Sequence, residues 1–231
     1  MAIPAALAAY YGGPKVMAKS VAVTPKWIDR ALQGIAFWIG HRRALYSGYS
    51  LGESALVAEL CNMIFSHLPE EQLLRCEVQY VELIGGTVTS TLTMTKARAD
   101  IVILRKPLRK GVSANAEYVI EVKRASSSNA MIDNDLKRLA AVKRAHPSLV
   151  AYLVVIAEAD RPRRFVTESG SALTTIFRIP DTDQLYRVRR VLKASHSFKN
   201  ADRAQYACLI EVSPPMPRAT IRRHSPWSAQ R

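Results

Sequence analysis

A strand, a helix and a second strand follow one another between residues 117 and 157, and this order constrains the fold more than any other feature. The first segment, EYVIEVKR (117–124), has the β-branched and aromatic composition of a strand buried on both faces. Residues 129–145 carry apolar side chains at helical spacing, and PSLVAYLVVIAEA (147–159) is a strongly apolar strand. Two strands joined by a helical crossover pair in parallel, so the sequence predicts an α/β fold.

Further segments before the crossover extend this pattern. The first expected helix starts at a Thr24 cap with Pro25 in its first turn. A cap is also expected at Ser126 to Ser128, before the crossover helix. The expected elements ahead of the crossover are helices at about 24–45 and 53–67 and strands at 76–84 and 99–105.

The chain is expected to have three parts. These are an N-terminal arm and helix (1–50), a core (51–160) and a C-terminal extension with a basic tail (161–231). The helix of the first part is expected either to cover the core or to make the contact of a homodimer. Its apolar stripe is compatible with both.

The composition favours a soluble protein with a polyanionic partner. The 231 residues include 33 Lys and Arg against 19 Asp and Glu, a formal net charge of +14. Such a charge favours nucleic acid, because phosphates neutralised by the protein release condensed counterions; the alternative is a basic protein without such a partner. No membrane partner is expected, since no apolar run is long enough to span a bilayer. Three widely spaced cysteines suit a cytoplasmic location and do not have metal-site spacing.

An acid and an amine stand two residues apart in the first crossover strand, at Glu121 and Lys123. Because side chains alternate along a strand, both point to the same face. A lone pair of this kind is most simply a salt-bridged strand end. Asp100, at the start of DIVIL on the preceding strand, changes this interpretation, because it can meet Glu121 and Lys123 at one sheet edge.

Two neighbouring carboxylates repel each other, and a divalent cation between them removes the repulsion. Mg²⁺ prefers oxygen ligands, so Asp100, Glu121 and the backbone carbonyl of Val122 are the expected metal ligands, and Mn²⁺ is expected to substitute. Lys123 would lie beside the metal-bound water and lower its pKa. The sequence thus outlines a site for phosphodiester hydrolysis.

The D-(x)20-E-x-K pattern of Asp100, Glu121 and Lys123, with its flanking helices and strands, resembles the PD-(D/E)XK nuclease superfamily. The resemblance covers residues 53–157, with Ala99 where the family often has proline. It implies a restriction-endonuclease-like αβββαβ core, a central mixed sheet flanked by helices, to which this chain adds an N-terminal helix and a C-terminal extension. It also implies dependence on a divalent metal and cleavage that leaves a 5′-phosphate.

The superfamily often has a further glutamate next to the metal, on the helix before the first strand. GESALVAELCNMIF offers Glu53 and Glu59. Glu59 is preferred because the Leu60, Met63 and Ile64 that follow it resemble the resolvase pattern. The expected catalytic residues are therefore Asp100, Glu121, Lys123 and Glu59.

The sequence thus predicts a cytoplasmic, Mg²⁺-dependent endonuclease that acts on DNA. The alternatives are a non-catalytic nucleic-acid-binding protein built on the same core, and an RNA-directed nuclease. Basic residues expected to bind the phosphates lie on the crossover helix and in YRVRRVLK, and they are Lys137, Arg138, Arg187, Arg189 and Arg190.

Overall fold

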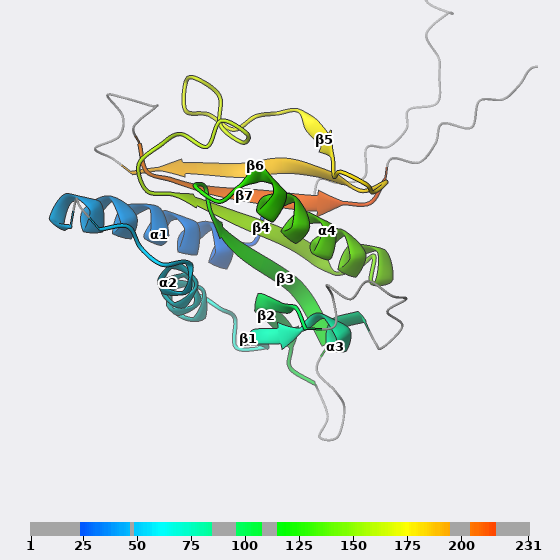
Figure 1. Cartoon of the computed structure of the whole chain (residues 1–231). Helices are drawn as coiled ribbons and strands as arrows, with labels where there is room; N and C mark the ends of the chain where they lie inside the picture. The colour runs from blue at the N-terminus through cyan, green and yellow to red at the C-terminus, as the bar shows by residue number, and fades with distance from the viewer. Residues whose placement is uncertain (1–23, 47–48, 85–95, 108–114, 195–203, 216–231) are drawn as a thin grey trace, which may run out of the picture.

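A seven-stranded mixed sheet with helices on both faces forms the centre of the molecule (Figure 1). The computed structural model of the chain describes residues 24–46, 49–84, 96–107, 115–194 and 204–215. The elements are α1 (Lys26–Leu45), α2 (Glu53–Phe65), β1 (Gln72–Gln79), α3 (Tyr80–Ile84), β2 (Arg98–Arg105), β3 (Asn115–Arg124), α4 (Asn129–Ala145), β4 (Val150–Ala157), β5 (Ile176–Arg178), β6 (Leu185–Lys193) and β7 (Tyr206–Ser213).

The strands lie side by side in the order β1-β2-β3-β4-β7-β6-β5. β3 and β4 are parallel and joined by α4, as the strand–helix–strand pattern predicts. The other neighbouring pairs of this sheet are antiparallel. The predicted α/β class is confirmed. The expected order helix, three strands, helix, strand is also present, with α3 inserted between β1 and β2.

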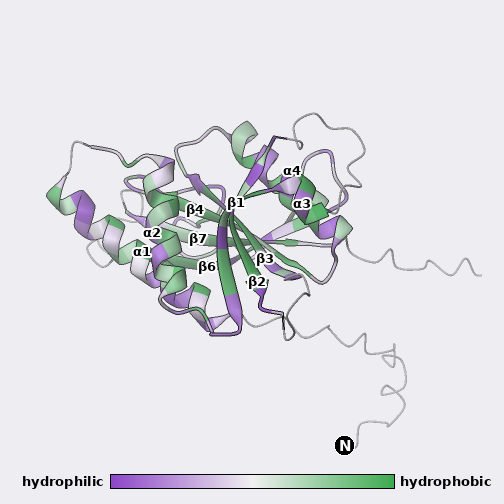
Figure 2. Ribbon diagram, turned by 90° about the horizontal axis from the view of Figure 1, so that it is seen from below, coloured by the Kyte–Doolittle hydropathy of each residue, from purple (hydrophilic) through white to green (hydrophobic). Residues whose placement is uncertain are grey.

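Each face of the sheet buries its own apolar layer, because side chains alternate along every strand. Ile120 and Val122 of β3 lie in the layer under α1 and α2. Val119 lies in the layer on the opposite face, with Leu136 and Leu139 of α4. Figure 2 shows the strands mainly in the hydrophobic colour, while the helices carry hydrophilic residues on part of their surface.

The N-terminal helix covers the core, which was one of the two roles expected for it. Ile28, Leu32 and Ile35 of α1 are fully buried in the layer above β3, β4 and β7. Pro25 precedes the helix, and neither it nor Thr24 caps it with a side chain. At α4 the expected cap is confirmed, because the Ser128 hydroxyl accepts a hydrogen bond from the N–H of Met131.

The strand predicted at 76–84 is wrong at both ends. β1 begins at Gln72 and ends at Gln79, and the next five residues form the short helix α3. Tyr80, at the start of α3, is fully buried in the layer that contains α4, where Val78 of β1 also packs.

The C-terminal extension adds its strands to the same sheet. β7 lies between β4 and β6, and Val212 of β7 pairs with Ala151 of β4. The N-terminal arm before residue 24 and the basic tail after residue 215 lie outside the described residues. Among the described helices, none is both long and apolar enough to cross a membrane.

Candidate active site

Asp100 on β2 and Glu121 on β3 lie next to each other. The two strands are antiparallel, with Ile101 opposite Ile120. Glu121, which follows Ile120, therefore meets Asp100, which precedes Ile101. The two carboxyl groups share a hydrogen bond. Asp100 Oδ2 also accepts a hydrogen bond of 2.7 Å from the N–H of Val122. The carboxyl pair expected from the sequence is therefore brought together.

Burial controls the protonation of this pair. It raises the pKa of Glu121 to about 8, and the negative charge of Asp100 adds to the rise, against the opposing effects of Tyr80 and Arg138. Burial also raises the pKa of Asp100, while the Val122 N–H and the Glu121 hydrogen bond favour its charged form. These effects favour the protonated form of Glu121 near neutral pH when no cation is bound.

Lys123 is held between two carboxylates from two different helices. Its Nζ atom lies 2.7 Å from Oε1 of Glu53, the first residue of α2, and 3.2 Å from Oδ2 of Asp135 on α4. Lys123 and Asp135 are both buried, with 8% and 1% of their surfaces exposed. A buried ammonium needs such partners, because an unpaired charge is costly away from water.

Tyr80 and Arg138 complete the surroundings of Glu121. The Tyr80 hydroxyl donates a short hydrogen bond to Glu121 Oε1. The Nε atom of Arg138 lies 3.9 Å from the same oxygen, and its guanidinium stacks over the Tyr80 ring. Arg138 is also ion-paired with Asp135. Glu121 is thus positioned by α3 and α4 as well as by its own strand.

The cluster has an excess of negative charge. It contains four carboxyl groups and only two cationic groups, those of Lys123 and Arg138. Even with one proton on Glu121, a net negative charge remains. A bound cation would compensate this charge and would displace the shared proton, because metal-ligating carboxylates are ionised.

The residues present fit a hard divalent cation. Within the ranges that the structure describes, no three His, Cys, Asp or Glu side chains converge as a metal-binding group. Asp100 and Glu121 supply two carboxyl groups, and the third predicted ligand, from Val122, is a backbone carbonyl. Mg²⁺ commonly uses one or two protein carboxylates and keeps several waters, so this small set of ligands is compatible with it.

The helix acid of the cluster is Glu53, and the preference for Glu59 is corrected. Glu53 forms the 2.7 Å contact with Lys123 from the first position of α2. Glu59 lies six residues later, which turns it by about 240° around the helix axis and moves it about 9 Å along it. It therefore faces another direction. Its sequence context gave no information on the distance to β3.

The basic residues predicted to bind phosphate have carboxylate partners within the chain. Lys137 pairs with Asp181, and Arg138 belongs to the cluster around Glu121. The remaining three lie on β6, where Arg187 and Arg189 contact Glu211 and Arg190 contacts Asp29.

The three β6 arginines lie over the opposite face of the sheet from Lys123. Arg187 pairs across β6 and β7 with Glu211, which shares its side of β7 with Leu209 in the layer under α1. Regular alternation would send Arg190 to the other face. A register shift between Val188 and Arg190 changes this, and Arg190 instead reaches Asp29 of α1.

A hollow of about 350 Å³ begins one residue after Lys123. It lies where β3 and β4 end, next to the segment that leads into α2. Its lining includes three arginines, two serines and two carboxylates, and Arg124 is ion-paired with Glu158 at 3.2 Å; these residues are Arg43, Arg124, Arg161, Ser50, Ser126, Glu158 and Asp160. Basic and hydroxyl side chains are the groups that commonly bind phosphate oxygens.

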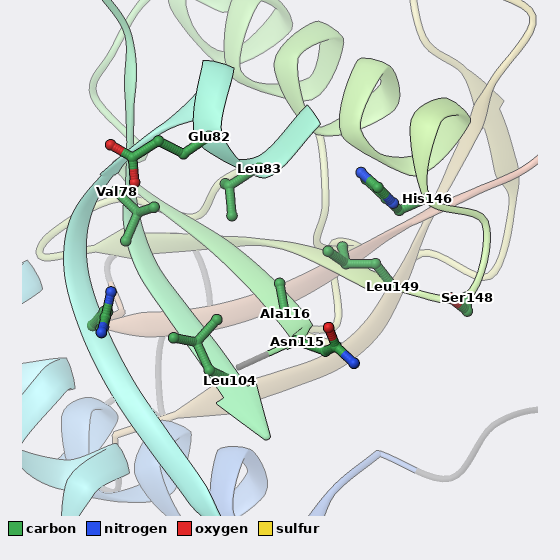
Figure 3. A pocket seen from close by; sticks show the side chains of 10 residues that line it. Val78, Glu82, Leu83, Leu104, Asn115, Ala116, His146, Ser148 and Leu149 are labelled. Carbon is green, nitrogen blue, oxygen red and sulfur yellow. The ribbon is translucent and has the colours of Figure 1, made fainter. Parts of the chain in front are cut away.

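A larger hollow, of about 600 Å³, lies at the other end of β3 (Figure 3). Asn115 and Ala116 at the start of β3 line it, together with Leu83 of α3 and His146 after α4 (Figure 3). Glu121 and Lys123 do not belong to its lining. Size alone therefore does not identify the site.

Two residues of the cluster were missed by the sequence analysis. Asp135 could have been found, because it interrupts the apolar stripe of α4 between Ile132 and Leu139 and an unpaired acid there would be costly. Tyr80 gave no such signal, since it fits the composition of a strand.

Comparison of the chain with protein-family models, curated proteins and solved structures finds no match. The assignment of a function therefore depends on the geometry of the cluster.

Proposed function

We propose that this chain is a Mg²⁺-dependent nuclease that hydrolyses phosphodiester bonds in DNA, built on a restriction-endonuclease-like core. The observation that carries the proposal is the convergence of Asp100, Glu121 and Lys123 from two strands. Glu121 and Lys123 follow Asp100 by 21 and 23 positions in the chain, and the three meet in one buried, negatively charged cluster. The parallel pairing of β3 with β4 through α4, after three antiparallel strands, supports the proposed core.

In this proposal Asp100, Glu121 and the carbonyl oxygen of Val122 hold the metal. When bound, Mg²⁺ supplies positive charge to the phosphate and makes a nearby water more acidic. With a cation bound, Glu121 would be ionised, and the carboxylates of Asp100 and Glu121 would offset its charge. Tyr80 keeps the Glu121 carboxylate oriented through its hydroxyl.

Lys123 is the proposed residue that positions the attacking water or a phosphate oxygen. The ammonium donates a hydrogen bond to Glu53, and the ion pair with Asp135 at 3.2 Å holds it from the side of α4. Because both partners come from helices packed on the sheet, the ammonium does not need to be ordered again when substrate binds.

The hollow beside Lys123 is the proposed path of the nucleic acid. Arg43 and Arg124 line it at the end of β3, and Arg124 follows Lys123 directly in the chain. A backbone bound there would bring neighbouring phosphates to the cluster. The β6 arginines, which were also expected to bind phosphates, do not line this hollow.

A panel of nucleic acids tests the proposal. The full chain is incubated with plasmid, linear duplex and branched DNA and with RNA, each with Mg²⁺, with Ca²⁺ and with EDTA. We expect Mg²⁺ to support cleavage of DNA, EDTA to abolish it, and Ca²⁺ to give binding with little turnover, because its geometry is less strict. Cleavage of RNA alone would replace DNA as the substrate. Undiminished cleavage in EDTA would contradict the metal site.

A further inference from the structure

Two of the three cysteines, which are far apart in the sequence, meet in the structure. The Sγ atoms of Cys61 on α2 and Cys76 on β1 are 3.3 Å apart. A disulfide has a sulfur–sulfur distance of about 2.05 Å, so a movement of roughly 1.3 Å would close the bond. The short connection between α2 and β1 reverses the chain and creates this contact.

The two thiols differ in their access to solvent. Cys76 is exposed on β1, Cys61 is half-buried, and Cys208 on β7 is fully buried. Burial and the neighbouring Cys76 raise the pKa of the Cys61 thiol. A reagent in solution therefore meets Cys76 first, and Cys61 lies within reach of whatever forms on Cys76.

We propose that Cys61 and Cys76 form a reversible disulfide by exchange with a small disulfide such as oxidised glutathione. The Cys76 thiolate attacks one sulfur of glutathione disulfide, forms a mixed disulfide and releases one glutathione. Cys61 then attacks the Cys76 sulfur and releases the second glutathione. The protein loses two protons and two electrons, and the two released glutathione thiols carry both.

The bond would connect two elements next to the carboxyl cluster. Cys61 lies two turns after Glu53 on the same helix, and Cys76 pairs across the strands with Ile101, the neighbour of Asp100. Oxidation would thus link α2 to the edge strand β1. The inference concerns the thiols alone and does not depend on the proposed nuclease activity.

The test uses the full-length protein, reduced and then equilibrated with glutathione at increasing fractions of the disulfide. After denaturation, free thiols are alkylated and the intact mass is measured. We expect the oxidised form to take one alkyl group, on Cys208, and to weigh about 2 Da less than the reduced protein before alkylation. Dithiothreitol should restore three alkylated cysteines. Three free thiols at every ratio, or a stable glutathione adduct on Cys76, would overturn the proposal.

Three variants make the assignment specific. Cys61→Ser should retain the glutathione adduct on Cys76, because no second thiol resolves it. Cys76→Ser should form no internal bond; Cys76 is exposed, so this change leaves the core intact. Cys208→Ala should form the bond as the wild type does. An internal disulfide that persists in Cys76→Ser would show that the bond involves other cysteines and would contradict the proposed pair.

Discussion

The Nζ atom of Lys123 lies 2.7 Å from Oε1 of Glu53, although the two residues are 70 positions apart in the chain. This contact joins the first residue of α2 to the end of β3. The segment before α2 is held as well, because the N–H of Leu51 donates a hydrogen bond to Oε2 of Glu158, which follows β4. The direction of the Lys123 ammonium thus depends on how α2 enters the fold.

Replacing Glu53 with glutamine should reduce cleavage while leaving binding intact. The amide keeps the size of the side chain but removes the charge that orients Lys123. Loss of an orienting partner typically lowers activity by about 10–100-fold. The measurement is single-turnover cleavage of plasmid DNA with saturating protein, together with the Kd in Ca²⁺.

Glu59→Gln is the matched control, since it makes the same change six residues later on α2. It should cleave at the wild-type rate. Loss of activity in Glu59→Gln with normal activity in Glu53→Gln would restore the assignment made from the sequence and contradict the geometry.

The protonation of Glu121 predicts how stability depends on pH in the absence of metal. Its pKa is raised from 4.5 in the unfolded chain to about 8 in the fold. The folded state therefore binds the proton more tightly, and this contribution to stability is present below pH 4.5 and lost as the pH rises through about 8. In EDTA, the free energy of unfolding of the wild type should decrease relative to that of Glu121→Gln as the pH rises from 4.5 to about 8.

Urea unfolding at several pH values measures this difference. The comparison with Glu121→Gln removes the contributions of the other titrating groups, which both proteins share. Parallel profiles for the two proteins would show that Glu121 is ionised in the metal-free fold. Added Mg²⁺ should reduce the difference, because it binds the ionised pair.

Tyr80→Phe should destabilise the protein, because it removes the donor that satisfies Glu121 Oε1 in the core. Leaving a buried acceptor without a partner costs about 1–3 kcal/mol. Tyr118→Phe is the control: this ring is half-buried and packs against Trp27, a contact that phenylalanine retains. Equal free energies of unfolding for the two variants would contradict the role of the Tyr80 hydroxyl.

The path of the nucleic acid can be tested by salt dependence. Each phosphate contact contributes a slope of about −0.9 to log K against log salt on duplex DNA. The double variant Arg43→Gln with Arg124→Gln should reduce the steepness of this slope by the amount expected for up to two phosphate contacts. The pair Arg189→Gln with Arg190→Gln removes the same charge on β6, outside the lining of this hollow, and should leave the slope nearly unchanged. A flatter slope in the β6 double variant, with an unchanged slope in the Arg43 and Arg124 double variant, would place the nucleic-acid contacts on β6 instead.

Local patterns predicted the part of the fold that depends on neighbouring residues. The crossover from β3 through α4 to β4 could be recognised because apolar periodicity separates a buried strand from a helix. Asp100, Glu121 and Lys123 could be placed together because strand alternation and antiparallel pairing bring them to one face. Ser128 could be recognised as a cap from its position before the periodic segment.

Features that depend on tertiary contacts were not predictable in this way. α3 replaces the end of the predicted strand, and the hydroxyl of Tyr80 at its start is bonded to Glu121, 41 positions later in the chain. The choice between Glu53 and Glu59 depends on where α2 begins relative to β3. The bulge after Val188, which brings Arg190 to Asp29, leaves no clear mark in the alternation of YRVRRVLK.

In the proposed nuclease, Asp100 and Lys123 perform the chemistry and contribute little to binding. The most direct measurement compares wild type, Asp100→Asn and Lys123→Ala in single-turnover cleavage of plasmid DNA with Mg²⁺, alongside their Kd values for the same DNA in Ca²⁺. We predict that both variants bind with a Kd close to that of the wild type, because one charge among many carries little of the phosphate attraction, and that neither cleaves detectably. Cleavage by either variant at the wild-type rate would contradict the claim.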